Sequence, residues 1–334
     1  MFRMPAEWCA HQRTWMIWPC RAEVWEGRLA ATRAAYADLA RAIRQFEPVT
    51  MIADPAEAAG AQAILGAEIE VLALPVDDSW ARDQLPCFVH DGKRLAASCF
   101  RFNAWGNKYH PHDRDAALAG ALSGAMGVPA HRADLVAEGG AISVDGEGTV
   151  LTTETCLLNE NRNPGLDKAE VTARLNAALG TEKVIWLPGN ADEIETDGHV
   201  DCIAVFTAPG EVLAEAPGAP DHPWHAIRAE NIRALEGATD AMGRPLTVRT
   251  LLDANSAPDI GSRFCKSYLN YYLPNGGVVM PAYGVPEDGA AREILADVFP
   301  DRTLVQVPVS DIALGGGGIH CVTQQEPKVA NHWS

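Results

Sequence analysis

The sequence predicts an α/β fold built from five similar units, each with an apolar strand, a helix and a second strand. The units recur about every 50 residues, which suits a radial array better than two independent lobes. In four units the second strand also ends in a loop rich in acids or glycine. The simpler alternative to the array is a single α/β sheet, which alternating strands and helices usually predict. The loops favour the array, because an array brings them to one axis.

The units follow one another along the chain, and each apolar stretch predicts a strand. Their strand, helix and strand segments are 49–55, 56–66 and 69–83; 94–102, 114–127 and 131–140; 148–159, 166–180 and 183–201; 203–208, 225–238 and 246–256; and 276–284, 287–299 and 303–321. The first, second, third and fifth units end in DDSWARD, AEGG, ETDGHVD and GGGGIHC. We expect the reactive residues in these four loops.

The composition limits the possible functions. The 334 residues are 47% hydrophobic and 21% charged, which is ordinary for a globular enzyme with a sizeable core. No stretch reaches the ~18 apolar residues that span a bilayer, and the first residues lack the pattern of a signal peptide. The formal net charge of −17 would repel a phosphate backbone and attract a cation. We therefore expect a cytoplasmic protein that binds neither nucleic acid nor membrane.

The eight cysteines are spread along the chain without a C-x-x-C pair, which argues against a disulfide framework and a zinc finger. One of them, Cys321, follows closely on the run Gly315 to Gly318. A cysteine without other evidence is usually a small buried hydrophobic residue, and an isolated run of glycines is usually a flexible tail. Because an apolar strand and the polar CVTQQ bracket the run, we expect it to be ordered and take Cys321 as a candidate nucleophile.

A general base for this cysteine is expected from another loop. His320 is adjacent to it, but neighbours in an extended segment point to opposite faces. His199 and Asp201 lie two residues apart, so in an extended backbone they share a face, and a glycine beside them permits a tight approach. The alternative for this pair is a solvated surface turn.

Carboxylates occupy the remaining loops. Glu138 precedes two glycines, which imply that something packs closely against the backbone. The acids Asp77, Asp78 and Asp83 flank a tryptophan. An aromatic face beside carboxylates can bind a cation, and Trp80 offers such a face. The alternative is that each acid is simply a solvated surface residue. Together with a thiol and an imidazole, carboxylates suit a guanidinium, whose five donors they match in bidentate fashion. The sequence thus predicts attack on the central carbon of a guanidinium.

Six motifs stand in order along the chain: MPAEWCAHQRTWMIWP, DDSWARD, FNAWGNKY, EGGAISVDGEGTVLTTETCLLNENRNP, ETDGHVD and GGGGIHCVTQQEP. They resemble the agmatine deiminases and their bacterial peptidylarginine-deiminase-like relatives, in the guanidine-modifying pentein superfamily. The likeness runs from about residue 4 to residue 327. It implies a five-bladed α/β propeller, the pentein fold, with residues 1–334 as a single catalytic domain.

The same resemblance implies a role for each candidate residue. The implied catalytic residues are the nucleophile Cys321, the general acid and base His199, and the guanidinium-holding Glu138, Asp83 and Asp201. Trp80 is expected to pack beside the substrate, and Gly317 and Gly318 to let the backbone lie close to it. Glu195 is the acid named for the ammonium tail of agmatine, with solvated surface as the alternative.

The implied reaction is the deimination of agmatine. The thiolate attacks, ammonia leaves, and water releases N-carbamoylputrescine from an S-alkylthiouronium intermediate. The reaction needs no metal and no organic cofactor, and the partner is a small cationic guanidine. Relatives of this kind commonly form homodimers, which is the expectation here.

Two departures from the family pattern touch the expected pocket. Gly318 stands where asparagine is usual before IHC, and QLPCF follows WARD where SGPTF or a similar run is common. Guanidinium chemistry is unaffected, so the tail of the substrate is the open question. Trp105, Tyr109 and His110, on a long loop, lie either near the entrance or at the surface.

Three alternatives remain open at this point. In the first, the chain is an amidinotransferase, or a hydrolase of another substituted guanidine, and uses the same cysteine and histidine. A second alternative makes His199, Asp201 and Cys321 the ligands of a metal ion. In the third, the chain is a catalytically inert propeller that only binds.

Overall fold

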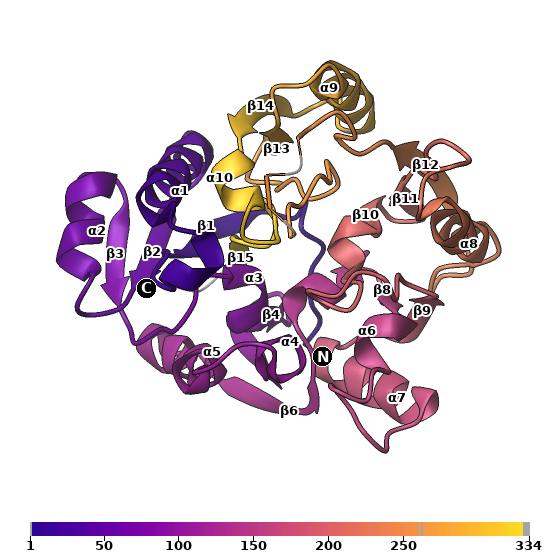
Figure 1. Cartoon of the computed structure of the whole chain (residues 1–334). Coiled ribbons are helices and arrows are strands. Elements are labelled where there is room, and N and C mark those ends of the chain that lie inside the picture. The colour runs from indigo at the N-terminus through magenta and orange to yellow at the C-terminus, as the bar shows by residue number, and fades with distance from the viewer. Residues whose placement is uncertain (1, 259, 262, 330–334) are drawn as a thin grey trace.

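A computed structural model describes residues 2–258, 260–261 and 263–329 of the chain. Within these residues the strands form five separate small sheets. Figure 1 shows the sheets grouped around the middle of the molecule, with the longer helices on the outside. The chain therefore has the mixed α/β fold that its alternation of strands and helices predicts.

The five sheets have two to four strands each. In spatial order the strands are β15 (Gln324–Pro327), β1 (His11–Ile17), β2 (Val49–Ala53) and β3 (Glu70–Ala73); β4 (Cys87–His90), β5 (Leu95–Arg101) and β6 (Ala130–Val136); β7 (Ser143–Val144), β8 (Thr149–Thr153) and β9 (Lys183–Leu187); β10 (Ala204–Ala208), β11 (Glu211–Glu215) and β12 (Thr247–Leu251); and β13 (Gly277–Ala282) and β14 (Thr303–Pro308). Each sheet ends in a parallel pair.

Long helices connect the parallel strands, and short helices follow the strands. The long helices are α1 (Leu29–Arg44), α2 (Ala58–Leu65), α5 (Asp113–Met126), α7 (Lys168–Leu179), α8 (His225–Glu236) and α9 (Glu287–Val298). The short ones are η1 (Ala22–Trp25), α3 (Ala81–Gln84), α4 (Ala104–Asn107), η2 (Gly139–Ala141), α6 (Glu154–Leu157), η3 (Val200–Cys202) and α10 (Ser310–Ala313). No helix in the described ranges has the length and apolar character needed to cross a membrane.

The fourth unit differs from the prediction in its first strand. The stretch 203–208 contains β10, but the strand that pairs in parallel with β12 is β11. A turn at Gly210, with φ +78°, joins β10 to β11, and such a tight connection gives antiparallel pairing. The strand, helix and strand unit is therefore β11, α8 and β12. The other four units contain the predicted elements.

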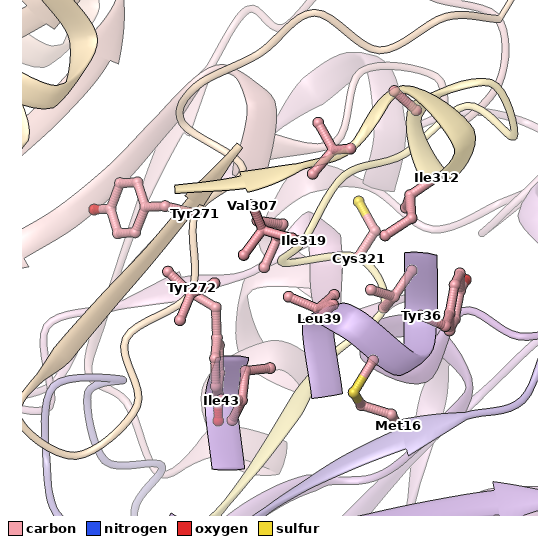
Figure 2. Packing of buried hydrophobic residues seen from close by; sticks show 14 of the residues in the cluster. Met16, Tyr36, Leu39, Ile43, Tyr271, Tyr272, Val307, Ile312, Ile319 and Cys321 are labelled. Carbon is pink, nitrogen blue, oxygen red and sulfur yellow. The ribbon is translucent and has the colours of Figure 1, made fainter. Parts of the chain in front are cut away.

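A hydrophobic cluster supports the segment that carries Cys321. Tyr36, Leu39 and Ile43 are buried on one face of α1, at the spacing of successive helical turns. Cys321 and Ile319 belong to the same cluster, as Figure 2 shows. The cysteine therefore lies on a packed base, which restricts its movement.

Candidate active site

Short segments after different strands bring the predicted residues together. Asp83 lies in α3, Glu138 directly precedes η2, His199 directly precedes η3, Asp201 lies within η3, and Cys321 follows α10. These segments come after β3, β6, β9 and β14, which are the second strands of parallel pairs. Loops at the carboxyl ends of parallel strands are where α/β folds build ligand sites.

Asp201 connects the cysteine to a second histidine. Cys321 Sγ lies 3.5 Å from Asp201 Oδ2, and the same oxygen accepts a hydrogen bond from His320 Nδ1 at 2.8 Å. The sequence reasoning missed this contact because it assumed an extended backbone. Residues 319–322 form a turn instead, and His199 and Asp201 are joined by the start of η3. His320 and Cys321 therefore reach one carboxylate.

Asp201 is held ionised with one oxygen free. Burial would raise the pKa of its carboxyl, but His320, His199 and Arg82 lower it below the ordinary value. Asp201 Oδ1 is buried and has no hydrogen-bond partner among the residues that the structure describes. A buried acceptor without a partner costs about 1–3 kcal/mol, so this oxygen is a natural place for a donor on a ligand.

The surroundings of Cys321 oppose ionisation of its thiol. Burial raises its pKa well above the ordinary value, and the neighbouring carboxylates of Asp201 and Asp83 raise it further. A bound cation would act in the opposite direction.

His199 lies between two carboxylates. Its Nε2 is 3.3 Å from Glu138 Oε2, and its Nδ1 is 3.9 Å from Asp83 Oδ1. Burial alone would lower the pKa of this imidazole, but Asp83, Cys156 and Glu138 raise it well above the ordinary value. The histidine is therefore an imidazolium that can donate a proton.

Arg162 braces this part of the site. Its Nε is 2.7 Å from Glu138 Oε1, in an ion pair with both side chains fully buried. Its other nitrogens contact Asp197 Oδ2 at 2.7 Å and the Thr196 carbonyl at 3.1 Å. Burial would raise the pKa of Glu138, but Arg162 and His199 lower it. Arg162 stands in the motif NENRNP, yet no local pattern marks it as a partner of Glu138.

Both oxygens of Asp83 are oriented by protein donors. Oδ1 accepts from the Gly140 amide and Oδ2 from Trp105 Nε1, each at 2.9 Å. Trp105 has φ +55°, a conformation that costs about 1–3 kcal/mol in a non-glycine residue and is typical of functional sites. A Cβ at Gly140 would lie 2.5 Å from His199 Nδ1. The paired glycines after Glu138 therefore do permit close packing, as predicted.

The glycine run before the cysteine is ordered for a similar reason. A Cβ at Gly317 would lie 2.5 Å from the Trp80 ring and 3.1 Å from Cys321 Sγ. A Cβ at Gly318 would lie 2.6 Å from Asn270 Oδ1, the atom that accepts the Cys321 amide at 3.2 Å. The glycines thus make room for protein side chains. Their proximity to a substrate stays a prediction.

A cavity of about 530 Å³ opens onto three of the five predicted catalytic residues, whereas Asp83 and Glu138 do not belong to its lining. Its lining includes Cys321, His199, Asp201 and Glu195. Trp80 is buried, stacks on Trp25 with ring centroids 5.5 Å apart, and does not belong to the residues that line this cavity. Contact between Trp80 and a substrate therefore also stays a prediction.

Comparison with known proteins decides the family. The model of the Porphyromonas-type peptidyl-arginine deiminase family matches residues 3–327. The chain belongs to this family. A Streptomyces coelicolor protein is 44% identical over 336 residues, covering 98% of this chain and 99% of that one. The agmatine deiminase of Stutzerimonas stutzeri is 40% identical over 351 residues, with 98% and 95% covered. The solved agmatine deiminase of Enterococcus faecalis has a TM-score of 0.93 and 37% identity, with 98% and 96% covered.

Membership of the deiminase family confirms the resemblance that the six motifs indicate. The match covers the segments that carry all five predicted catalytic residues. The match does not say which residues contact the tail of a substrate.

The long loop that contains α4 contacts two residues of the cavity lining, Glu195 and Arg263. Glu195 Oε2 accepts a hydrogen bond from the Tyr109 hydroxyl at 2.6 Å, and Arg263 Nη1 donates to that hydroxyl at 2.8 Å. His110 is exposed. Of the three aromatic residues considered for the entrance, Trp105 thus contacts Asp83, Tyr109 contacts Glu195, and His110 is at the surface.

Two acids of DDSWARD lie outside the catalytic cluster. Asp78 is ion-paired with Arg21 at 3.0 Å, and Asp77 accepts from the backbone amide of Arg114 at 3.0 Å. Only Asp83 of these three acids contacts the catalytic histidine candidate.

Among the residues that the structure describes, one group of side chains has the spacing of metal ligands. Glu138, Cys156 and His199 place ligand atoms within 4.8 Å of one another, whereas His199, Asp201 and Cys321 do not form such a group. In the first group the Arg162 guanidinium, 2.7 Å from Glu138 Oε1, already pairs with the carboxylate. His199, Asp201 and Cys321, the residues of the metal alternative, lack the spacing of ligands to one ion.

Proposed function

We propose that this chain hydrolyses agmatine to N-carbamoylputrescine and ammonia. The observation that carries the chemistry is the ionised carboxylate of Asp201, which has one free oxygen and lies 3.5 Å from the Cys321 thiol. The agmatine deiminase relatives, at 40% and 37% identity over nearly the whole chain, support the choice of substrate.

The carboxylates bind the guanidinium group in this proposal. Asp201 Oδ1 accepts one N–H, Asp83 a second, and Glu138 braces the group from the side of His199. Because hydrogen bonds to Gly140 and Trp105 already orient Asp83, little ordering remains when the substrate binds. The central carbon then faces the Cys321 sulfur.

The bound cation activates the nucleophile. Its charge offsets the carboxylates that raise the thiol pKa, so Cys321 loses its proton to solvent and the thiolate attacks the central carbon. His199, an imidazolium, protonates one nitrogen of the tetrahedral adduct, and ammonia leaves. An S-alkylthiouronium remains on the enzyme.

The same histidine completes the cycle. Neutral after the first step, His199 takes a proton from water, and hydroxide attacks the thiouronium carbon. The carbon–sulfur bond breaks, the thiolate is restored, and the ureido product forms, its surplus proton converting ammonia to ammonium. No step requires a metal or an organic cofactor.

A substrate screen tests this proposal. Purified protein is given agmatine, arginine and other small guanidines, and ammonia and ureido product are measured for the wild type and for Cys321→Ser. We expect one ammonia for each N-carbamoylputrescine, and no turnover by the variant. Amidino transfer to an added amine would instead indicate an amidinotransferase. Failure of a haloacetamidine to label Cys321 would indicate a binding protein.

We propose in addition that the five sheets are the blades of a pentein propeller and that residues 1–334 are one catalytic domain. The five separate sheets support this, with their crossover helices on the outside in Figure 1. A cytoplasmic homodimer completes the proposal, since eight free thiols suit a reducing compartment. Cell fractionation and analytical ultracentrifugation test these two points.

A further inference from the structure

Two cysteines that the proposed reaction does not use share the cavity with Cys321. Cys202 and Cys265 both line it, and both are partly exposed. Their thiols also interact with each other, although the two residues lie far apart in the sequence. We propose that Cys202 and Cys265 form a redox-active dithiol, which two-electron oxidants such as hydrogen peroxide convert into a disulfide at the wall of the active site.

The chemistry requires only the two thiols and the oxidant. One thiol attacks peroxide to give a sulfenic acid and water, and the second attacks that sulfur to give the disulfide and a second water. The hydrogen bond to Cys265, followed by burial, raises the pKa of Cys202 well above the ordinary value. Cys202 is therefore a poor candidate for the first attack on peroxide, since the thiolate is the reactive form.

The disulfide would disturb the support of the nucleophile. Cys202 Sγ accepts a hydrogen bond from Asn270 Nδ2 at 3.4 Å, while Asn270 Oδ1 accepts the Cys321 amide at 3.2 Å. A sulfur–sulfur bond is about 2.05 Å long, so the Cys202 sulfur must move from its position beside Asn270. Asn270 would then lose one of the contacts that orient it.

The other end of the bridge lies against the segment that precedes the glycine run. The Cys265 amide donates to the Ala313 carbonyl at 3.1 Å, and Ala313 is the last residue of α10. A displacement of this loop therefore reaches the backbone that leads to the nucleophile. Because a misplacement of about 1 Å can cost about a hundredfold in rate, we expect the oxidised protein to lose at least about tenfold in kcat/KM.

Mass spectrometry tests the pairing without any measurement of activity. Cys321→Ser protein is treated with hydrogen peroxide, alkylated and digested, and we expect a peptide pair linked through Cys202 and Cys265 that dithiothreitol separates. Phenylarsine oxide, which condenses with two neighbouring thiols and releases water, should bind one per chain and be lost in Cys202→Ser/Cys321→Ser protein. Wild-type protein with Cys321 blocked by a haloacetamidine is a second sample. A link to any other cysteine, or no link in either sample, would overturn the proposal.

An activity measurement tests the consequence. Wild type, Cys202→Ser, Cys265→Ser and the matched control Cys9→Ser are treated with diamide, a dithiol oxidant, and each is compared with its own untreated sample. We expect the wild type and Cys9→Ser, whose exposed thiol is not in the cavity, to lose activity that dithiothreitol restores. The other two variants should keep theirs. Equal loss in all four proteins would overturn the link between the dithiol and catalysis.

Discussion

The thiol of Cys321 lies 3.5 Å from the carboxylate of Asp201, and both side chains are buried. A carboxylate so close to a thiol opposes its ionisation. The Cys321 thiol alone is therefore a poor nucleophile, and a bound cation is needed to favour its thiolate form.

Alkylation kinetics test this relationship. Because the Cys321 pKa is raised above its ordinary value of 9.0, we expect neutral iodoacetamide to react slowly at pH 7 and faster as the pH rises beyond 9. Chloroacetamidine is a cation, so we compare the ratio of its alkylation rate to that of iodoacetamide. This ratio should be at least about tenfold larger for the enzyme than for glutathione, since one pKa unit changes the thiolate fraction tenfold. Asp201→Asn should speed the neutral reagent and slow the cationic one. An equal ratio of the two alkylation rates for the enzyme and for glutathione would show that a bound cation does not favour the Cys321 thiolate.

Glu195 is the acid that we expect to bind the ammonium tail. Glu195→Gln should lower kcat/KM for agmatine by about 10- to 100-fold, since a hydrogen bond to a charged group contributes about 1.5–3 kcal/mol. Butylguanidine, whose tail is uncharged, should be turned over equally by wild type and variant. Asp192→Asn, a change of an exposed acid in the lining of the same cavity, is the matched control. An equal loss of kcat/KM for both substrates would show that Glu195 does not bind the ammonium group.

The buried pair of Arg162 and Glu138 makes a prediction about stability. Arg162→Ala leaves the Glu138 carboxylate without its partner, so we expect a loss of about 3–5 kcal/mol in the free energy of unfolding, measured with urea. Activity should fall as well, because Arg162 also holds the loop before His199. Arg174→Ala removes the more exposed pair with Asp134 and should cost less than about 1 kcal/mol. Similar losses in the two variants would contradict this account.

Glu7 makes stability depend on pH. Burial would raise its pKa, but His320 and Arg82 lower it from 4.5 to about 2. A depressed pKa stabilises the fold above the unfolded-state value, and this stability is lost as the pH falls through the folded-state value. Glu7→Gln should therefore cost about 1–3 kcal/mol at pH 7, and its difference from wild type should shrink as the pH falls from about 5 towards 2. Exposed Glu23→Gln is the control. A difference that does not change with pH would rule out this charge effect.

The glycine run predicts a coupled loss of activity and stability. Gly317→Ala places a methyl group against Trp80 and the Cys321 sulfur, so we expect a loss of about 1–3 kcal/mol in stability together with lower kcat. For Gly317→Val and Gly318→Val, the contacts with Trp80 and Asn270 likewise predict that activity and stability both fall. Gly289→Ala in α9, with open space around it, should leave both nearly unchanged.

Much of the fold could be predicted because strand and helix patterns are local. The repeating plan locates β2, α2 and β3 and the corresponding elements of three other units. It misses β1, α1 and the short antiparallel strands β4 and β7, which lie outside the plan. It also assigns β10 in place of β11, since the pattern of an apolar strand does not specify its partner.

The sequence by itself determined the family, the chemical types in four loops and the expectation that those loops meet. Only the tertiary structure decided that His320 shares a carboxylate with Cys321, and that Asp83, which the family resemblance names, lies beside His199. The physical reason is distance along the chain. Motifs and periodicity describe neighbours in sequence, whereas each of these contacts joins segments whose relative positions depend on how separate sheets pack.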